Sequence, residues 1–192
     1  MNEAKKPLFT VREMVLIGIM AAIICIAAPF SIPTPTGIPL SLATFAVYLS
    51  GLMLGRRDGT LAVVLYVLIG MIGLPVFSGF SGGIAKLFGV TGGYILGYIP
   101  CALICGVFSD LFTEKSRFWA YPVGIILGTL VCYAFGTAWF VIFTKSELLS
   151  AIALCVLPYL PGDAVKTVAA CAIAMPLKSR LRRLFERKKK SV

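Results

Sequence analysis

The sequence predicts an all-α integral membrane protein, a six-transmembrane-helix bundle with both termini in the cytoplasm. Three observations lead to this fold class. Of the 192 residues, 59% are hydrophobic and only 14% are charged, whereas charged residues make up about a quarter of a typical soluble domain. Apolar runs of membrane-spanning length follow one another along the chain. Most of the cations flank these runs.

Six apolar runs are separated by short polar or Gly/Pro-rich breaks. At 1.5 Å of rise per residue, helices of these lengths cover roughly 22–39 Å, which brackets a hydrocarbon core of about 30 Å. A chain of this length holds one domain, so we expect residues 1–192 to form a single transmembrane domain with a basic cytoplasmic tail at about 178–192. The predicted spans are 14–30, 38–55, 60–74, 91–112, 118–143 and 148–177, the last interrupted by Pro158, Pro161 and Gly162.

The placement of charge supports this count and its orientation. The chain has 18 Lys and Arg and a net charge of +10. With the amino terminus in the cytoplasm, the basic residues at 56–57, at 115–117 and in the tail all fall on the cytoplasmic side, as the positive-inside rule requires. The sequence has no basic stripe interleaved with aromatic residues, so we expect contact with anionic membrane lipid and not with nucleic acid. Lys5, Lys6 and Arg12 precede the first run and fall on the same side, whereas Lys86, Lys145 and Lys166 lie elsewhere.

The first run also has features of a removable signal peptide. Basic residues precede it, and small residues lie near its end at 25–28. Removal would leave five spans and would turn either the double arginine or the basic tail outward. We therefore expect the first run to remain in the protein as a span.

The residue types present exclude much enzyme chemistry. The chain contains no His, which excludes His-dependent triads and His-rich zinc sites. Cys101 and Cys105 share a helix face and could hold a soft metal, but neither a His nor a second Cys pair completes four ligands. We expect the six Cys residues to serve in packing, and we expect no catalytic residue, metal or cofactor.

Small residues recur four apart on several predicted helices. Pairs such as Gly93 and Gly97 allow two helix backbones to approach closely, and packing inside the bundle explains most of them. Gly18 and Ala22, on the first predicted helix, leave two interpretations open. They either pack within the bundle or form an outer face that docks another membrane protein.

A glycine-rich loop connects the third and fourth spans. It reads GLPVFSGFSGG from residue 73 and continues as GVTGGY from residue 89. Glycine allows the backbone to adopt positive φ and to approach a ligand closely, and Thr91 is a candidate N-cap for the fourth span. A plain turn is one interpretation. A pocket wall or lid is favoured, because non-helical backbone at the membrane surface needs polar partners.

Two ionisable residues lie in the last predicted span. The segment PYLPGD ends at Asp163, and Lys166 follows three residues later. Pro161 suits the first turn of a helix, so Asp163 and Lys166 are expected on one helix face about one turn below the outer surface. Ionisable groups at that depth face the bundle interior or a wet cavity. A structural salt bridge and a polar ligand site both remain open, and the ligand site is favoured.

The two outer motifs resemble those of the BioY family, the biotin-specific S components of energy-coupling-factor (ECF) transporters. GLPVFSGFSGG with GVTGGY, and PYLPGD followed by Lys166, occur in the family's order, and the resemblance covers nearly the whole chain. It implies a six-helix protein of the bacterial plasma membrane that captures biotin from outside with high affinity. It further implies a transmembrane T component and two cytoplasmic ATPases as partners, with Gly18 and Ala22 on the docking face.

The resemblance also implies where biotin, the transported ligand, is bound. It places the contacts to the ureido head at Asp163, an acceptor, and Lys166, a donor. Lys86 is either a solvated loop charge or the partner of the biotin carboxylate, and Ser81 stands where family members can carry Asn. The expected substrate-binding residues are Asp163, Lys166, Ser81, Gly82, Gly83, Tyr94, Phe77 and Lys86.

Other functions remain possible from the residues alone. An S component for another small vitamin would need the same donor, acceptor and apolar surface. A stand-alone secondary transporter usually has repeated broken helices, and only one broken helix is visible here. An intramembrane enzyme would have to use Asp163 alone as its acid or base.

Overall fold

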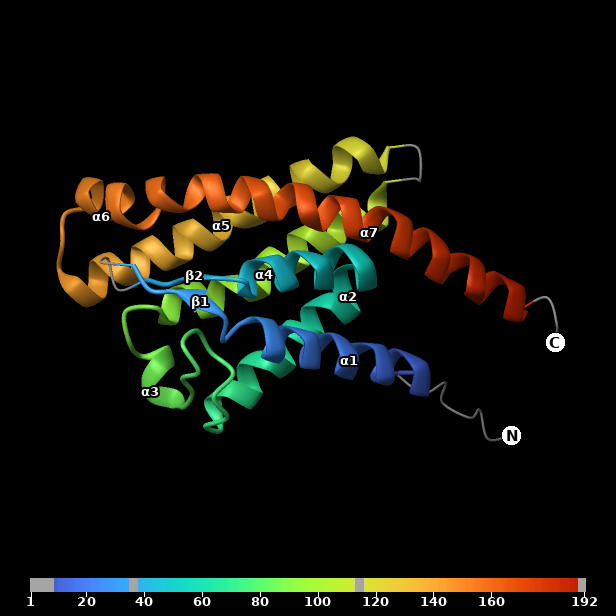
Figure 1. Ribbon diagram of the computed structural model, residues 1–192, viewed down its shortest axis with the longest axis horizontal. Coiled ribbons are helices and arrows are strands. Elements are labelled where there is room, and N and C mark those ends of the chain that lie inside the picture. Colours follow the sequence, from blue (N-terminus) through green and yellow to red (C-terminus); the bar gives the residue numbers. More distant parts are fainter. Residues whose placement is uncertain (1–8, 35–37, 113–115, 190–192) are drawn as a thin grey trace, which may run out of the picture.

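The computed structural model describes residues 9–34, 38–112 and 116–189, with side-chain surroundings up to Ser179. The prediction of a mostly helical protein is confirmed (Figure 1). In chain order the elements are α1 Val11–Ala27, β1 Ser31–Ile32, β2 Leu40–Ser41, α2 Ala43–Met71, α3 Ile84–Leu87, α4 Gly92–Leu111, α5 Arg117–Thr144, α6 Leu148–Cys155, η1 Leu157–Tyr159 and α7 Leu160–Lys189.

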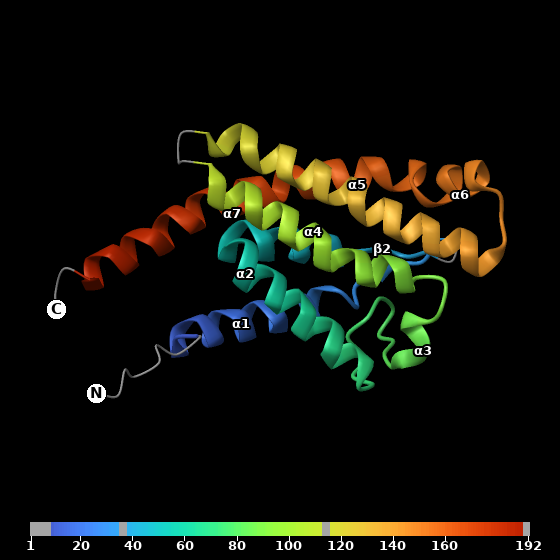
Figure 2. The same cartoon turned by 180° about the vertical axis from the view of Figure 1, so that it is seen from behind.

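Among the residues that the structure describes, three helical stretches are long and apolar enough to cross a membrane, namely Gly92–Leu111, Arg117–Thr144 and Leu148–Ser179. Figures 1 and 2 show α4, α5 and α7 side by side along the length of the bundle. The strands, α3 and α6 lie toward one end, whereas α1 begins and α7 leaves the bundle toward the other. We call these the strand end and the basic end.

Helix α2 consists of two arms that meet at Gly55, where the backbone has a φ of 83° and is not helical. Figure 1 shows the first arm running away from the strands and the second arm returning toward α3. Near the bend, Ser50 Oγ donates to the Gly59 carbonyl at 2.8 Å, which ties the two arms together. The two predicted runs at 38–55 and 60–74 correspond to these two arms.

An acidic side chain from another helix stabilises this bend. The Arg56 backbone N–H lies at the start of the second arm, where the helix offers it no acceptor. It donates instead to Asp110 Oδ2 at 2.9 Å. A carboxylate that accepts from an open helix N-terminus supplies the hydrogen bond that an N-cap normally provides. Asp110 therefore joins the end of α4 to the bend in α2.

Two helix starts differ from the predicted ones for local reasons. α1 begins at Val11 and not at residue 14, because Thr10 and Glu13 form a capping box in which Thr10 N donates to Glu13 Oε2 at 2.8 Å. α2 begins at Ala43, because Leu40–Ser41 before it is an extended strand that pairs Leu40 with Ile32 in a two-stranded sheet.

The glycine pairs of α4 pack inside the bundle, as predicted. A Cβ on Gly93 would lie 2.2 Å from Trp139 Cβ, and one on Gly97 would lie 3.2 Å from Cys132 Cα. Such contacts require the backbones of α4 and α5 to approach closely. Gly18 differs, since its Cβ would meet nothing within 4 Å, and both Gly18 and Ala22 are exposed on α1.

A further expectation is wrong. Thr91 makes no capping hydrogen bond, because its backbone is already helical, with φ −92° and ψ −2°, whereas a capping residue needs an extended conformation. In the basic segment from residue 178, α7 continues as one helix to Lys189.

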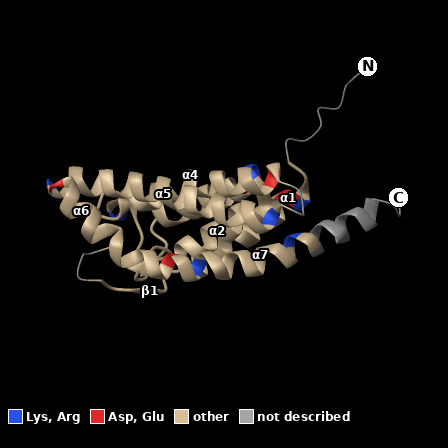
Figure 3. Cartoon of the chain, turned by 90° about the horizontal axis from the view of Figure 1, so that it is seen from above, with Lys and Arg blue, Asp and Glu red and all other residues tan. Residues whose placement is uncertain are grey.

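The described charges are concentrated at the basic end. Figure 3 shows most of the coloured Lys and Arg near the start of α1 and where α7 leaves the bundle, with few charged residues in the middle of the bundle. Lys178 Nζ lies 3.6 Å from Asp110 Oδ1 and donates to Ser109 Oγ at 2.6 Å. This polar network holds α7 against α4 at the basic end.

Gly55→Ala should destabilise the protein. The new Cβ would lie 2.4 Å from Asp110 Oδ1 and the residue would keep a φ of 83°, and strained positions of this kind cost about 1–3 kcal/mol. Thermal unfolding in detergent should show a lower Tm. Gly18→Ala is the matched control, because that Cβ meets no atom within 4 Å. Equal Tm values for the two variants would contradict the role given to the bend.

Candidate functional site

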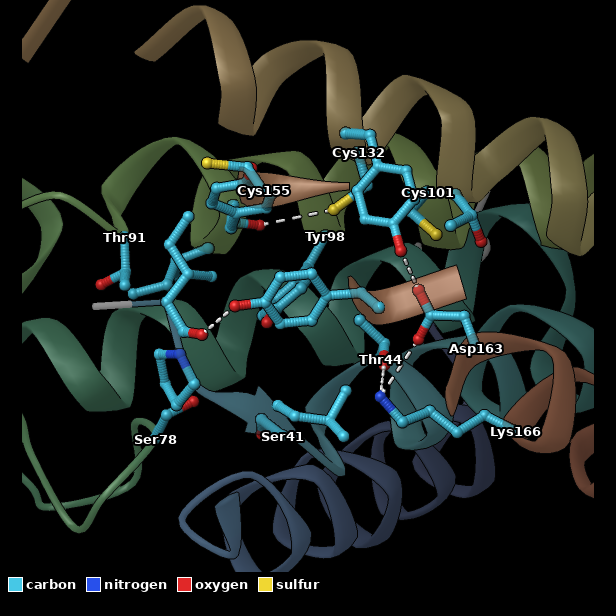
Figure 4. A pocket seen from close by; sticks show the side chains of 18 of the residues that line it. Ser41, Thr44, Ser78, Thr91, Tyr98, Cys101, Cys132, Cys155, Asp163 and Lys166 are labelled. Atoms are coloured by element: carbon cyan, nitrogen blue, oxygen red, sulfur yellow. Dashed lines mark hydrogen bonds and ion pairs between the residues drawn. The ribbon is translucent and has the colours of Figure 1, made fainter. Parts of the chain in front are cut away.

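A cavity lies at the strand end of the bundle. Its walls come from β2, the first turn of α2, the start of α4, the middle of α5 and the start of α7 (Figure 4). About 690 Å³ of space lies between the protein atoms around it, counted out to its open mouth.

An ion pair forms one wall of this cavity. Lys166 Nζ lies 3.1 Å from Asp163 Oδ1, and each side chain is only 11% exposed. Lys166 Nζ also donates to Thr44 Oγ1 at 3.0 Å, and the Tyr133 hydroxyl donates to Asp163 Oδ2. The i,i+3 spacing on α7 brings the two charges together, as predicted, while α2 and α5 supply the other partners.

The pair retains hydrogen-bonding capacity toward the cavity that it lines. An ammonium has three N–H donors, and among the described residues Asp163 and Thr44 accept two of those on Lys166. A carboxylate has about four acceptor sites, and described side chains use one on each oxygen of Asp163. One donor and about two acceptor sites therefore remain for a bound molecule.

The rest of the cavity wall is mainly aromatic and apolar. Tyr94 and Tyr98 line it from α4, and Cys101, Cys132 and Cys155 also contribute to its wall. Within the described part of the chain, no group of three potential ligands could hold a metal ion. These thiols are therefore best explained as small packing residues.

Thr34 and Ile38, which lie between β1 and β2, contact the turn η1 beside the cavity. The Tyr159 hydroxyl donates to the Ile38 carbonyl and lies 2.9 Å from Thr34 Oγ1. Tyr159 and Ile38 both line the cavity. This part of the cavity wall is thus held by polar contacts between residues that are distant in the sequence.

The glycine-rich loop contributes to the cavity differently from the prediction. Ser78 lines the cavity, whereas Ser81, Gly82, Gly83 and Phe77 do not. Ser81 Oγ donates to the Ser78 carbonyl at 2.8 Å. A Cβ on Gly82 would lie 2.2 Å from the Leu74 carbonyl. The predicted glycine and serine positions therefore shape the loop that presents Ser78.

Phe77 is fully buried on the other side of that loop. Its ring packs edge-on against Tyr66 with 5.6 Å between the ring centres, and it fills the space that a side chain at Gly70 would occupy. Phe77 thus anchors the loop to the second arm of α2.

Four of the predicted residues line the cavity, namely Asp163, Lys166, Tyr94 and Lys86. Figure 4 shows Ser78 and Thr91 across the cavity from Asp163 and Lys166. Sequence reasoning missed Tyr133 and Thr44, which contact the ion pair from other helices. In the sequence, each of these two residues is marked only by a hydroxyl within an apolar run. Several other residues of this chain share that feature.

Comparison with known proteins identifies the family. The BioY family model matches residues 1–183. The biotin transporter BioY of Thermotoga maritima is 39% identical over 168 residues, covering 87% of this chain and 96% of that protein. The probable biotin transporter BioY of Pyrococcus horikoshii is 37% identical over 166 residues, covering 85% and 94%.

A solved structure gives the same answer for the fold. The S-component for biotin from an ECF-type ABC transporter superposes with a TM-score of 0.76 at 26% identity, covering 88% of this chain and 92% of that one. The resemblance seen in the two outer motifs is thereby confirmed over most of the chain. The chain is a multi-pass membrane protein and belongs to the BioY family.

Proposed function

We propose that this chain is the substrate-binding S component of an ECF-type importer and that it binds biotin from the extracytoplasmic side. The observation that carries the proposal is the cavity wall in which a carboxylate and an ammonium lie 3.1 Å apart beside an aromatic and apolar surface. Relatives named as biotin transporters, and a similar structure described as an S-component for biotin, support this ligand.

The ureido head of biotin matches the free hydrogen-bonding groups of the ion pair. The head offers one carbonyl acceptor and two N–H donors. In the proposed complex its carbonyl accepts from Lys166, and an N–H donates to Asp163. Hydrogen bonds to charged groups contribute about 1.5–3 kcal/mol each. Because the pair has no net charge, a neutral head leaves no uncompensated charge in the cavity.

The carboxylate tail would lie across the cavity, toward Lys86. Lys86 lies on α3 and lines the cavity. α3 packs against α4, and Thr91 directly precedes α4. The thiophane ring would lie between the two ends, against Tyr94. Ser81, Gly82 and Gly83 would contribute by holding the loop, and Phe77 would contribute by anchoring it.

We propose that the chain crosses the plasma membrane six times as one domain, residues 1–192, with both termini in the cytoplasm. The spans would be α1, the two arms of α2, α4, α5 and the α6–α7 segment. The cations at the basic end support the orientation, because cytoplasmic loops are enriched in Lys and Arg. The cavity would then open to the outside.

The partners would be a transmembrane T component and two cytoplasmic ATPases, which supply the energy for import. Gly18 and Ala22 lie on an exposed face of α1, and exposed residues of that size permit another helix to approach closely. In this arrangement the chain itself is not an enzyme and needs no cofactor.

Asp163→Asn and Lys166→Ala, made separately, should each weaken biotin binding by about 1–3 kcal/mol, or about 5- to 150-fold in Kd. Each change removes a hydrogen bond to the head and leaves the partner ion without its counter-charge. Calorimetric titration of the purified protein in detergent measures the effect. Lys145→Ala removes an exposed cation that does not line the cavity and should leave the isotherm unchanged. Unaltered isotherms in both pocket variants would remove the proposed site.

Lys86→Ala should weaken the binding of biotin by about 3- to 10-fold and should leave the binding of biotin methyl ester unchanged. The ester keeps the head and ring but lacks the anionic tail. An equal loss for both ligands would show that Lys86 does not contact the carboxylate.

Titration with a panel of vitamins tests the ligand directly. Biotin should bind and vitamins that lack a cyclic urea should not. Tighter binding of another vitamin would overturn the ligand assignment while leaving the family assignment intact.

Trp at both Gly18 and Ala22 should abolish ATP-driven uptake in vesicles that contain the T component and the ATPases, because the bulky rings block close helix contact. Biotin binding in detergent should be unchanged, since both residues lie outside the cavity. Ile23→Trp is the matched control, as Ile23 is exposed on α1 but about 100° further round the helix than Ala22. Normal uptake by the double variant would remove the docking role.

A further inference from the structure

The ion pair in the cavity is held by two side chains from neighbouring helices. The Tyr133 hydroxyl, on α5, donates to Asp163 Oδ2. Thr44 Oγ1, in the first turn of α2, accepts from Lys166 Nζ at 3.0 Å. These contacts lie on the outer sides of the pair, whereas the contact between Lys166 Nζ and Asp163 Oδ1 at 3.1 Å lies between its two members. Figure 4 shows Thr44, Asp163 and Lys166 meeting on one side of the cavity.

Each contact fixes the orientation of a charged group that could otherwise rotate. The χ2 torsion of an Asp side chain is broad, so a single bond from Lys166 would leave the carboxylate plane free to turn. A second bond, from Tyr133 to the other oxygen, fixes that plane. Likewise, two of the three N–H groups of Lys166 are directed at Asp163 and Thr44, and the tetrahedral ammonium then has one direction left for its third donor.

We infer that Tyr133 and Thr44 are positioning residues that hold the Asp163–Lys166 pair open toward the cavity and thereby select a neutral cyclic urea over a cationic head. This inference rests on the proposed function. In the held arrangement the ligand meets a donor at Lys166 and acceptors at Asp163. A urea complements both groups, whereas a guanidinium presents donors to the Lys166 donor and adds a like charge beside it.

Loss of either contact should relax this selection. Without the Tyr133 hydroxyl, the free oxygen of Asp163 can turn toward the cavity, and the carboxylate can take a guanidinium with both oxygens. Without the Thr44 hydroxyl, the Lys166 ammonium can turn fully toward Asp163, so the urea carbonyl loses its donor. In both cases the affinity for a urea falls, while the affinity for a cationic head falls less or rises.

The test compares biotin with 2-iminobiotin, whose head is a guanidinium at neutral pH. The wild-type chain should favour biotin by about 100-fold or more. In Tyr133→Phe and in Thr44→Val this ratio of Kd values should fall about tenfold. Thr44→Ser retains the hydroxyl and should keep the wild-type ratio. Tyr48→Phe is the matched control, because it removes a hydroxyl of the same wall that bonds Thr129 at 2.8 Å and not the ion pair.

The ratio separates positioning from general weakening. A purely structural defect lowers the affinity for both ligands together, so an unchanged ratio in Tyr133→Phe and Thr44→Val would overturn the inference even if both affinities fell. If Tyr133→Phe does not fold, the comparison of Thr44→Val with Thr44→Ser decides. If the wild type does not bind biotin, or if Asp163→Asn binds it normally, the proposed function fails and the inference fails with it.

Discussion

The ion pair between Asp163 and Lys166 is the interaction on which the rest of the site depends. Moving two charges out of water has a desolvation penalty that their mutual attraction often does not repay, and well-packed apolar residues would stabilise such a position at least as well. Ionisable residues at membrane depth are accordingly rare and usually functional. A pair that lines a cavity and keeps free donor and acceptor capacity is therefore better explained by a ligand than by folding stability.

The fold has to bring three helices together at this one point. α7 carries both charges, and the bend at Gly55 returns the chain so that the two arms of α2 lie at different positions in the bundle, with Thr44 near the pair. A glycine also allows α4 and α5 to pack closely, since the Tyr94 ring of α4 occupies the space that a side chain at Gly136 of α5 would fill. The glycines thus determine how near the helices come, and the polar contacts determine which side chains meet.

The sequence predicts regular features well and long-range contacts poorly. The fourth and fifth runs agree with α4 and α5 to within one residue at each end, because hydropathy alone limits them. The i,i+3 spacing likewise predicted the ion pair. Tyr133 and Thr44 are separated from their partners by 30 and 122 residues, and no local pattern distinguishes them from other hydroxyls in apolar helices. Phe77 was expected in the pocket, but the turn of the glycine-rich loop directs it against Tyr66.

In the proposed complex, the charges at the two ends of the cavity favour one direction for a ligand with a neutral head and an anionic tail. If the tail pointed toward α7, its carboxylate would lie beside Asp163, and two like charges in a poorly hydrated site repel strongly. Lys166 could offset only part of that repulsion, because Asp163 and Thr44 already accept two of its donors. With the head toward α7, the neutral pair meets a neutral group and the tail lies toward Lys86, a cation without an acidic partner among the described residues that line the cavity. The charge distribution alone therefore favours entry with the urea first, and the aromatic surface between the two ends has only to accommodate the ring.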